Sequence, residues 1–189
     1  MLNDTEHRKG GQQMRPIFLC GFMGCGKSTV GRLLARRLKC HCTDLDDYIE
    51  KQENMTIPEI FEQKGEEYFR QVETDALAAF GDMGGVVATG GGALLSERNG
   101  ETAMNAGMVV FIDTDFRTCY DRIKDDPHRP IAASSTKEQL RERFENRRPK
   151  YQAHSHYQIS GGYPALVIAV KIERLYKKYL REAEGNGFE

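Results

Sequence analysis

The sequence has no long apolar run and almost no net charge. None of its apolar stretches approaches the roughly 20 residues that a helix needs to cross a bilayer, so we expect no membrane partner. The formal net charge of −1 argues against a nucleic-acid partner. Residues 1–13 are polar and lack the apolar segment of a secretory signal, and we expect a disordered N-terminal extension there.

The chain also lacks paired cysteine motifs. Its five cysteines are an odd number without C-x-x-C spacing, which favours free thiols in a cytoplasmic protein. Cys40-His41-Cys42 and His154-x-His156 contain metal-ligating residue types, but neither has the second ligand pair of a zinc finger. We therefore expect no zinc site in these segments.

Short apolar runs alternate with longer helical patterns along the chain. The runs predict strands at residues 17–20, 86–89 and 108–112, with weaker strands at 41–43 and 156–160. This alternation is typical of the α/β class, here three α/β/α layers around a five-stranded parallel sheet. With 189 residues, we expect a single monomeric domain at 14–181 and a disordered tail at 182–189.

A phosphate-binding motif follows the first predicted strand. Residues 21–28, Gly-Phe-Met-Gly-Cys-Gly-Lys-Ser, fit the pattern G-x-x-x-x-G-K-[ST], and a helical apolar pattern follows them. The loop's N–H groups and the helix N-terminus attract phosphate oxygens, Lys27 can reach the β- and γ-phosphates, and the Ser28 hydroxyl can hold Mg2+. The sequence predicts nucleoside triphosphate binding by Gly24, Cys25, Gly26, Lys27, Ser28 and Thr29.

Acidic and glycine-rich segments follow two further strands. Because ligands of parallel sheets bind beyond the carboxyl ends of the strands, both segments are candidate site residues. Asp44 and Asp46 can serve a magnesium ion and an acceptor hydroxyl, or one of them can simply cap a helix. The triplet Gly90–Gly92 lets backbone approach a small polar ligand, although a bare glycine triplet is also typical of a flexible loop.

Two arginines suggest an anionic acceptor. Arg70 and Arg147 can each grip a carboxylate, although a single arginine is more often a solvated helix charge. Arg70 falls in a helical insert expected at about 45–80, with a helix break at Lys64-Gly65. The aperiodic segment at about 125–136 is typical of a mobile lid, from which Arg129 can stabilise the transferring phosphoryl group.

Six motifs in order resemble the shikimate kinase family. They are residues 21–28, Asp44-Leu45-Asp46, residues 65–73, Gly90-Gly91-Gly92-Ala93, Arg129-Pro130 and Arg147-x-Pro149-x-Tyr151, and the resemblance extends from Met14 to about Leu180. It implies a P-loop kinase fold that uses ATP and Mg2+ to phosphorylate the 3-hydroxyl of shikimate. The product, shikimate 3-phosphate, belongs to chorismate and aromatic amino acid biosynthesis.

The resemblance also assigns roles to single residues. It implies that Ser28 and Asp44 serve Mg2+, that Lys27 and Arg129 serve the moving phosphate, and that Arg122 flanks adenine. Asp46 is implied as the candidate base, with Glu73 orienting Arg70. The implied substrate contacts are Asp46, Arg70, Gly90, Gly91, Gly92 and Arg147.

One segment departs from the family pattern. Many relatives have an arginine beside adenine near residues 160–164, whereas this chain has Ser-Gly-Gly-Tyr-Pro, in which Pro164 remains a candidate contact. Two alternatives stay open at this stage. One is another small-metabolite kinase, such as a gluconate-type or nucleotide kinase, and the other is a nucleotide-binding module without turnover.

Overall fold

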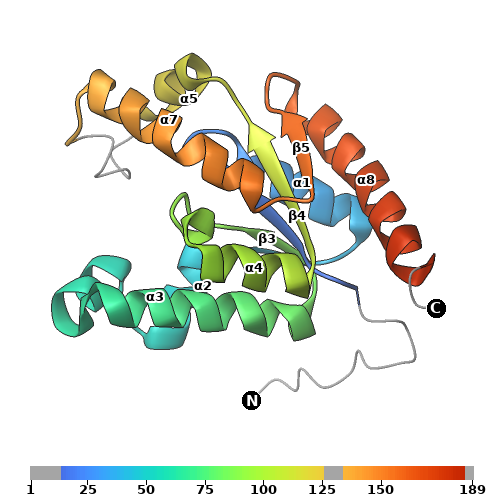
Figure 1. Cartoon of the computed structure of the whole chain (residues 1–189), viewed down its shortest axis with the longest axis horizontal. Helices are drawn as coiled ribbons and strands as arrows, with labels where there is room; N and C mark the ends of the chain where they lie inside the picture. The colour runs from blue at the N-terminus through green and yellow to red at the C-terminus, as the bar shows by residue number, and fades with distance from the viewer. Residues whose placement is uncertain (1–13, 126–133, 186–189) are drawn as a thin grey trace.

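The computed structural model describes residues 14–125 and 134–185, which build a five-stranded parallel sheet between two layers of helices (Figure 1). The sheet order is β2-β3-β1-β4-β5. The strands are β1 (Ile17–Cys20), β2 (Cys42–Asp44), β3 (Val86–Ala88), β4 (Met108–Asp113) and β5 (Tyr157–Ser160). The predicted α/β class and five parallel strands are confirmed.

The two strands with the weaker sequence signal, β2 and β5, form the edges of the sheet. All of their residues except Ile159 are partly or largely exposed, whereas every residue of β1 and β3 is buried. A strand buried on both faces needs a continuous apolar run, and an edge strand does not. This difference in burial explains why the central strands were easier to predict.

Five predicted strand boundaries were wrong by one residue, because hydrogen-bonded register rather than apolarity ends a strand. β2 runs from Cys42 to Asp44 rather than over 41–43, since Cys42 pairs with Val86 and Asp44 with Ala88. β3 stops at Ala88, the last residue in register with β1 and β2. β4 continues to Asp113, which pairs with Ser160, and β5 starts at Tyr157.

Helices cover both faces of the sheet (Figure 1). α1 (Lys27–Leu38) and α8 (Ala165–Gly185) pack together on one face, and α4 (Glu97–Ala106) and α7 (Lys137–Ala153) contact β4 from the other. The expectation of a disordered tail from residue 182 was wrong for residues 182–185. They continue α8, where Glu182 accepts a 3.1 Å hydrogen bond from Tyr157 and pairs with Lys178.

The expected helical insert consists of α2 (Leu45–Glu53) and α3 (Ile57–Met83). The predicted break is confirmed, because Gly65 inside α3 has φ 84° and ψ 170°. α5 (Phe116–Ile123) precedes the expected lid, of which residues 126–133 lie outside the described part of the chain. Thr136, the last lid residue expected, instead begins α7 as its N-cap, in a capping box with Gln139.

Among the residues described here, no helix combines the length and apolarity needed to span a bilayer.

Two helical glycines should respond in opposite ways to alanine. A Cβ at Gly81 would lie 3.5 Å from the Ala106 Cβ, an ordinary contact, whereas a Cβ at Gly100 would collide with the His154 ring. We expect Gly81→Ala to raise the free energy of unfolding by about 0.5–1 kcal/mol through helix propensity. Gly100→Ala should lower it by about 1–3 kcal/mol through overpacking. Urea unfolding of both variants tests this, and equal effects would contradict the packing described.

Candidate active site

The phosphate-binding loop joins β1 to α1 through three glycines in backbone conformations that side chains rarely adopt. Gly21, Gly24 and Gly26 have φ values of 142°, 80° and 105°. A Cβ at Gly21 would lie 2.7 Å from the Ile112 carbonyl oxygen, and one at Gly24 would lie 2.7 Å from that of Cys119. Gly26 is the N-cap of α1 and no side chain caps this helix, so its N–H groups face the pocket as an anion site.

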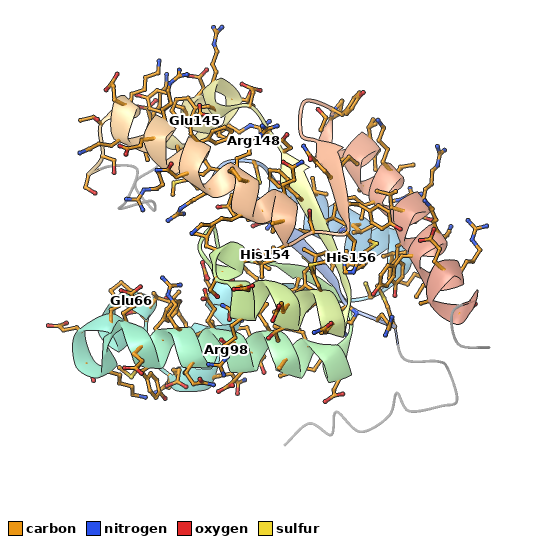
Figure 2. The ribbon with its side chains drawn as sticks, viewed as in Figure 1. Glu66, Arg98, Glu145, Arg148, His154 and His156 are labelled. Carbon is orange, nitrogen blue, oxygen red and sulfur yellow. The ribbon has the colours of Figure 1, made fainter. Side chains whose placement is uncertain are left out.

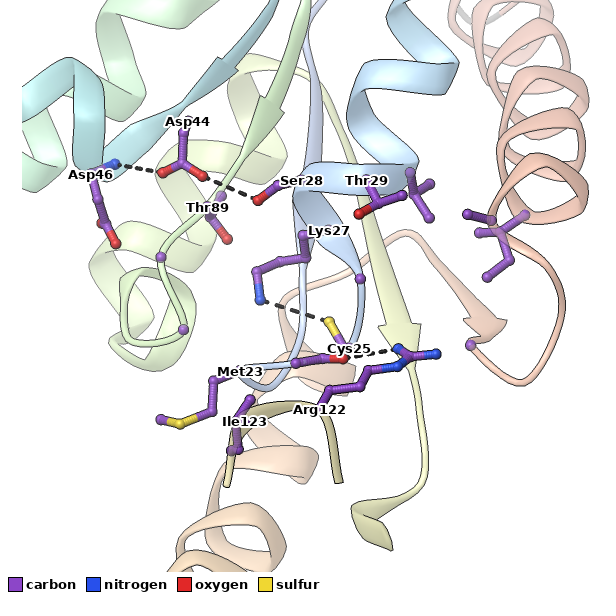
Figure 3. Close-up of a pocket in the computed structure, with 18 of the residues that line it drawn as sticks. Met23, Cys25, Lys27, Ser28, Thr29, Asp44, Asp46, Thr89, Arg122 and Ile123 are labelled. Carbon is purple, nitrogen blue, oxygen red and sulfur yellow. Dashed lines mark hydrogen bonds between the residues drawn. The ribbon is translucent and has the colours of Figure 1, made fainter. Parts of the chain in front are cut away.

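Side chains from several elements hold the loop in place (Figure 3). Arg122 of α5 donates to the Gly24 carbonyl at 2.9 Å, and Thr114 donates to the Cys25 carbonyl at 3.1 Å. The Lys27 ammonium lies over the loop, 2.8 Å from the Gly21 carbonyl oxygen and 3.1 Å from that of Phe22. The predicted nucleotide contacts Lys27 and Arg122 therefore meet at one end of the sheet.

The two candidate aspartates have separate positions. Asp44 ends β2 and caps α2, with Oδ1 accepting from the Asp46 backbone N–H at 3.2 Å and Oδ2 accepting from the Ser28 hydroxyl at 3.3 Å (Figure 3). The capping role left open by the sequence thus belongs to Asp44. Its second oxygen and the Ser28 hydroxyl form a pair of hard oxygen donors of the kind that Mg2+ prefers.

Asp46 lies in the first turn of α2 and faces the glycine triplet. Burial and the neighbouring Asp44 and Glu73 raise the pKa of Asp46 from 3.8 to about 6, while Lys27 acts in the opposite direction. A carboxylate with this pKa is largely ionised at neutral pH, yet it binds a proton far more readily than an exposed aspartate. Asp46 therefore has the protonation behaviour expected of a general base.

The charged side chains predicted to bind the acceptor converge on the glycine triplet. A Cβ at Gly90 would lie only 2.5 Å from Asp46 Oδ1, whereas those at Gly91 and Gly92 would lie 3.9 Å from Arg147 Nη1 and 3.7 Å from Arg70 Nη1. Asp46 comes from α2, Arg70 from α3 and Arg147 from α7. Three helices thus bring one carboxylate and two guanidinium groups to a short stretch of backbone.

Hydrogen bonds orient both guanidinium groups. Arg147 donates to the Gly91 carbonyl at 3.0 Å, and the buried Tyr151 hydroxyl donates to the same oxygen at 2.6 Å. Arg70 donates to Glu73 at 3.0 Å and to the exposed Glu66 at 3.2 Å. Burial raises the pKa of Glu73, and the neighbouring Arg70 opposes that rise. Glu73 therefore orients Arg70, as the sequence resemblance implied.

A pocket of about 410 Å³ connects the phosphate-binding loop to the glycine triplet. It is lined by all six predicted loop residues and by Asp44, Asp46, Gly90, Gly91 and Arg122. Arg70, Gly92 and Arg147 lie beside the pocket rather than in its lining, and Arg129 falls outside the described residues.

Sequence reasoning missed several residues of this region. Tyr163, just before α8, and Ala165 and Ile168 in its first turns line the pocket. The candidate contact that the sequence suggested in this segment, Pro164, does not line it. Tyr151 was noticed only as part of a motif, and its bond to Gly91 depends on a contact between distant segments. All five cysteines are free, and no cluster of potential metal ligands occurs among the His, Cys, Asp and Glu side chains described.

The raised pKa of Asp46 makes a prediction about stability. A carboxyl group whose pKa is higher in the fold stabilises the fold below pH 3.8, and this contribution is lost as the pH rises through about 6. Asp46→Asn removes the buried charge, so at pH 8 it should raise the free energy of unfolding by about 1–3 kcal/mol. The difference should nearly vanish at pH 4. Urea unfolding at both pH values tests this, and an equal effect at both would contradict the assigned pKa.

Comparisons with known proteins agree with this geometry. A family model described as "SKI: Shikimate kinase" matches residues 23–176. A shikimate kinase of Persephonella marina (strain DSM 14350 / EX-H1) is 43% identical over 139 residues, which cover 73% of this chain and 84% of that protein.

Solved structures extend the comparison. A shikimate kinase from Acinetobacter baumannii in complex with shikimate has a TM-score of 0.73 and 34% identity, with 93% of this chain and 96% of that chain covered. A gluconokinase from Sinorhizobium meliloti 1021 covers 90% of this chain and 99% of its own with a TM-score of 0.52, but its 16% identity shows a shared fold alone. From the family match and the sequence identity, this chain belongs to the shikimate kinase family.

Proposed function

We propose that this chain transfers the γ-phosphoryl group of ATP to the 3-hydroxyl of shikimate, giving ADP and shikimate 3-phosphate. The observation that carries the proposal is the convergence of Asp46, Arg70 and Arg147 on the glycine triplet, at one end of the pocket that begins at the phosphate-binding loop. A phosphoryl donor and a hydroxyl acceptor must meet in this way for direct transfer. The product belongs to the biosynthesis of aromatic amino acids.

The acceptor side of the site matches the chemistry of shikimate, which carries one carboxylate and several ring hydroxyls. Arg70 and Arg147 supply planar donors for the carboxylate. Because Gly90, Gly91 and Gly92 have no side chains, Asp46, Arg147 and Arg70 can approach this backbone and surround the position proposed for the ring. Gluconate shares the carboxylate but not the ring, and the glycine triplet with its two arginines favours shikimate.

On the donor side, the loop residues Gly24 to Thr29 hold the phosphates of ATP and Arg122 flanks adenine. Lys27 leaves the carbonyl oxygens of Gly21 and Phe22 to neutralise charge on the transferred group. We assign Arg129, which falls outside the described residues, to the same role. Ser28 and Asp44 fit Mg2+, which supplies charge neutralisation at the phosphates when bound.

Asp46 receives or orients the proton of the attacking hydroxyl. Its pKa of about 6 leaves it mainly ionised at neutral pH, and its carboxylate lies against Gly90, where the ring would bind. The charge of Asp44 beside it favours uptake of a proton as the reaction proceeds. In this proposal Asp46 acts as the base beside the shikimate hydroxyl, and the cationic Lys27 lies beside the phosphates of ATP.

We further propose that the chain is a single catalytic domain that acts as a monomer. The five free cysteines fit a reducing compartment such as the cytoplasm. In this proposal the chain binds neither a membrane nor a nucleic acid.

The test is ADP release from ATP and Mg2+ with shikimate, gluconate or a nucleoside monophosphate offered separately, beside a control without acceptor. We expect shikimate alone to stimulate ADP release and to gain the mass of one phosphoryl group. Removal of Mg2+ with EDTA should abolish the stimulation, since the phosphate charges then lack their counter-ion.

Other outcomes of this assay identify the alternatives. Stimulation by gluconate or a nucleoside monophosphate in place of shikimate would make the chain a different small-metabolite kinase. If the chain binds ATP but no acceptor stimulates ADP release, the chain is a nucleotide-binding module without turnover.

A further inference from the structure

A buried asparagine lies behind the proposed shikimate site, outside every motif that the sequence revealed. Asn99 belongs to the first turn of α4 and is only 2% exposed. Its neighbour Arg98 reaches from α4 to α3, donating to Gln71 at 3.0 Å (Figure 2). Asn99 therefore lies at the α3–α4 contact, where the side chain of a polar residue needs hydrogen-bonding partners.

The Asn99 amide connects two parts of the acceptor site. Its nitrogen donates to Glu73 Oε2 at 3.0 Å and to the Ala93 carbonyl at 2.9 Å. Glu73 is the partner of Arg70, and Ala93 directly follows the glycine triplet. One amide group thus links the Arg70 side of the site to the backbone of Gly90–Gly92.

The surroundings of Asn99 allow only one orientation of the amide. Two oxygen acceptors, from Glu73 and Ala93, face one end of the group, so that end must be the nitrogen. The Thr74 hydroxyl lies 2.5 Å from the other end, Oδ1, and donates to it. Every polar atom of the side chain is therefore bonded, which makes the link between α3 and α4 rigid.

The same link supports the negative charge of Glu73. This carboxylate is 2% exposed, and the same oxygen, Oε2, accepts from Arg70 and from Asn99. A buried carboxylate that loses one of two donors is less stable in its ionised form. Without Asn99, Glu73 would hold Arg70 less firmly, and the triplet would lose its anchor at Ala93.

We propose that Asn99 is a positioning residue for shikimate, acting through Glu73 on Arg70 and through Ala93 on the glycine triplet. Its side chain bonds Thr74, Glu73 and the Ala93 carbonyl, so its effect on the acceptor site is indirect. The inference rests on the proposed function, because it assigns Arg70 and the triplet to the acceptor.

The experiment compares the KM values for shikimate and ATP in the full chain and in two variants. Asn99→Asp keeps the size of the side chain but places a carboxylate against Glu73, and Asn99→Ala removes both donors. We expect each to raise the KM for shikimate by about tenfold or more, while the KM for ATP stays within about twofold. Arg147→Ala serves as a positive control, because it removes a proposed carboxylate contact directly.

A second control separates positioning from general loss of stability. Tyr176→Phe removes one hydrogen bond from a buried tyrosine of α8 to Arg15, at 2.8 Å, far from the glycine triplet in the chain. It should lower the melting temperature without changing either KM. If the Asp and Ala variants do not accumulate as folded protein, the same two KM values are measured for Asn99→Ser, which keeps one hydrogen-bond donor.

The outcomes are distinct. If shikimate does not stimulate ADP release by the wild-type chain, the proposed function itself is wrong. An active wild type whose Asn99 variants leave the KM for shikimate unchanged, or raise both KM values equally as the melting temperature falls, would show that Asn99 acts only on stability and would overturn this inference.

Discussion

The site depends on the close approach of three charged side chains to the backbone of Gly90–Gly92. Asp46 comes so near Gly90 that a Cβ there would lie 2.5 Å from its carboxylate, and Arg70 and Arg147 lie beside the next two glycines. Because the triplet has no side chains, charges from three helices can share one small volume. Burial and the nearby charges of Asp44 and Glu73 raise the pKa of Asp46 to about 6, and the two guanidinium groups create an environment suited to a small anionic ring.

The parallel sheet makes this approach possible. β1 ends at the phosphate-binding loop, β2 at Asp44 and β3 just before the triplet, so neighbouring strands deliver donor and acceptor groups to the same edge. α7 then closes the other side, where Arg147 and Tyr151 both bind the Gly91 carbonyl. Behind the triplet, Asn99 and Glu73 tie α4 to α3. The helices and strands thus hold the charged groups, and the bare backbone of the glycines lets these groups approach it closely.

Much of this arrangement could be predicted from local sequence patterns. The remainder could not, because it depends on contacts between segments that are distant in the sequence. The phosphate-binding loop and the central strands have strong signals because their spacing and apolarity are local properties. The exact ends of the strands depend on register between distant segments, and five of them, in central as well as edge strands, differ by one residue from the prediction. Asn99 was missed entirely, because no local sequence pattern distinguishes it from any other asparagine in a helix. Its role follows only from its hydrogen bonds to Glu73 and Ala93. Asp46 was identified, but its raised pKa follows from burial and from the charges of Asp44 and Glu73, which only the fold reveals.

The most direct test of this account is the turnover of shikimate by a Gly90→Ala variant. The added Cβ would displace the Asp46 carboxylate without touching the phosphate-binding loop, so we predict a loss of about 10²-fold in kcat/KM for shikimate. Affinity for ATP should stay close to that of the wild type, and Gly81→Ala controls for an added methyl group elsewhere. A Gly90→Ala variant with wild-type turnover would contradict the claim that the bare backbone of the triplet organises the site.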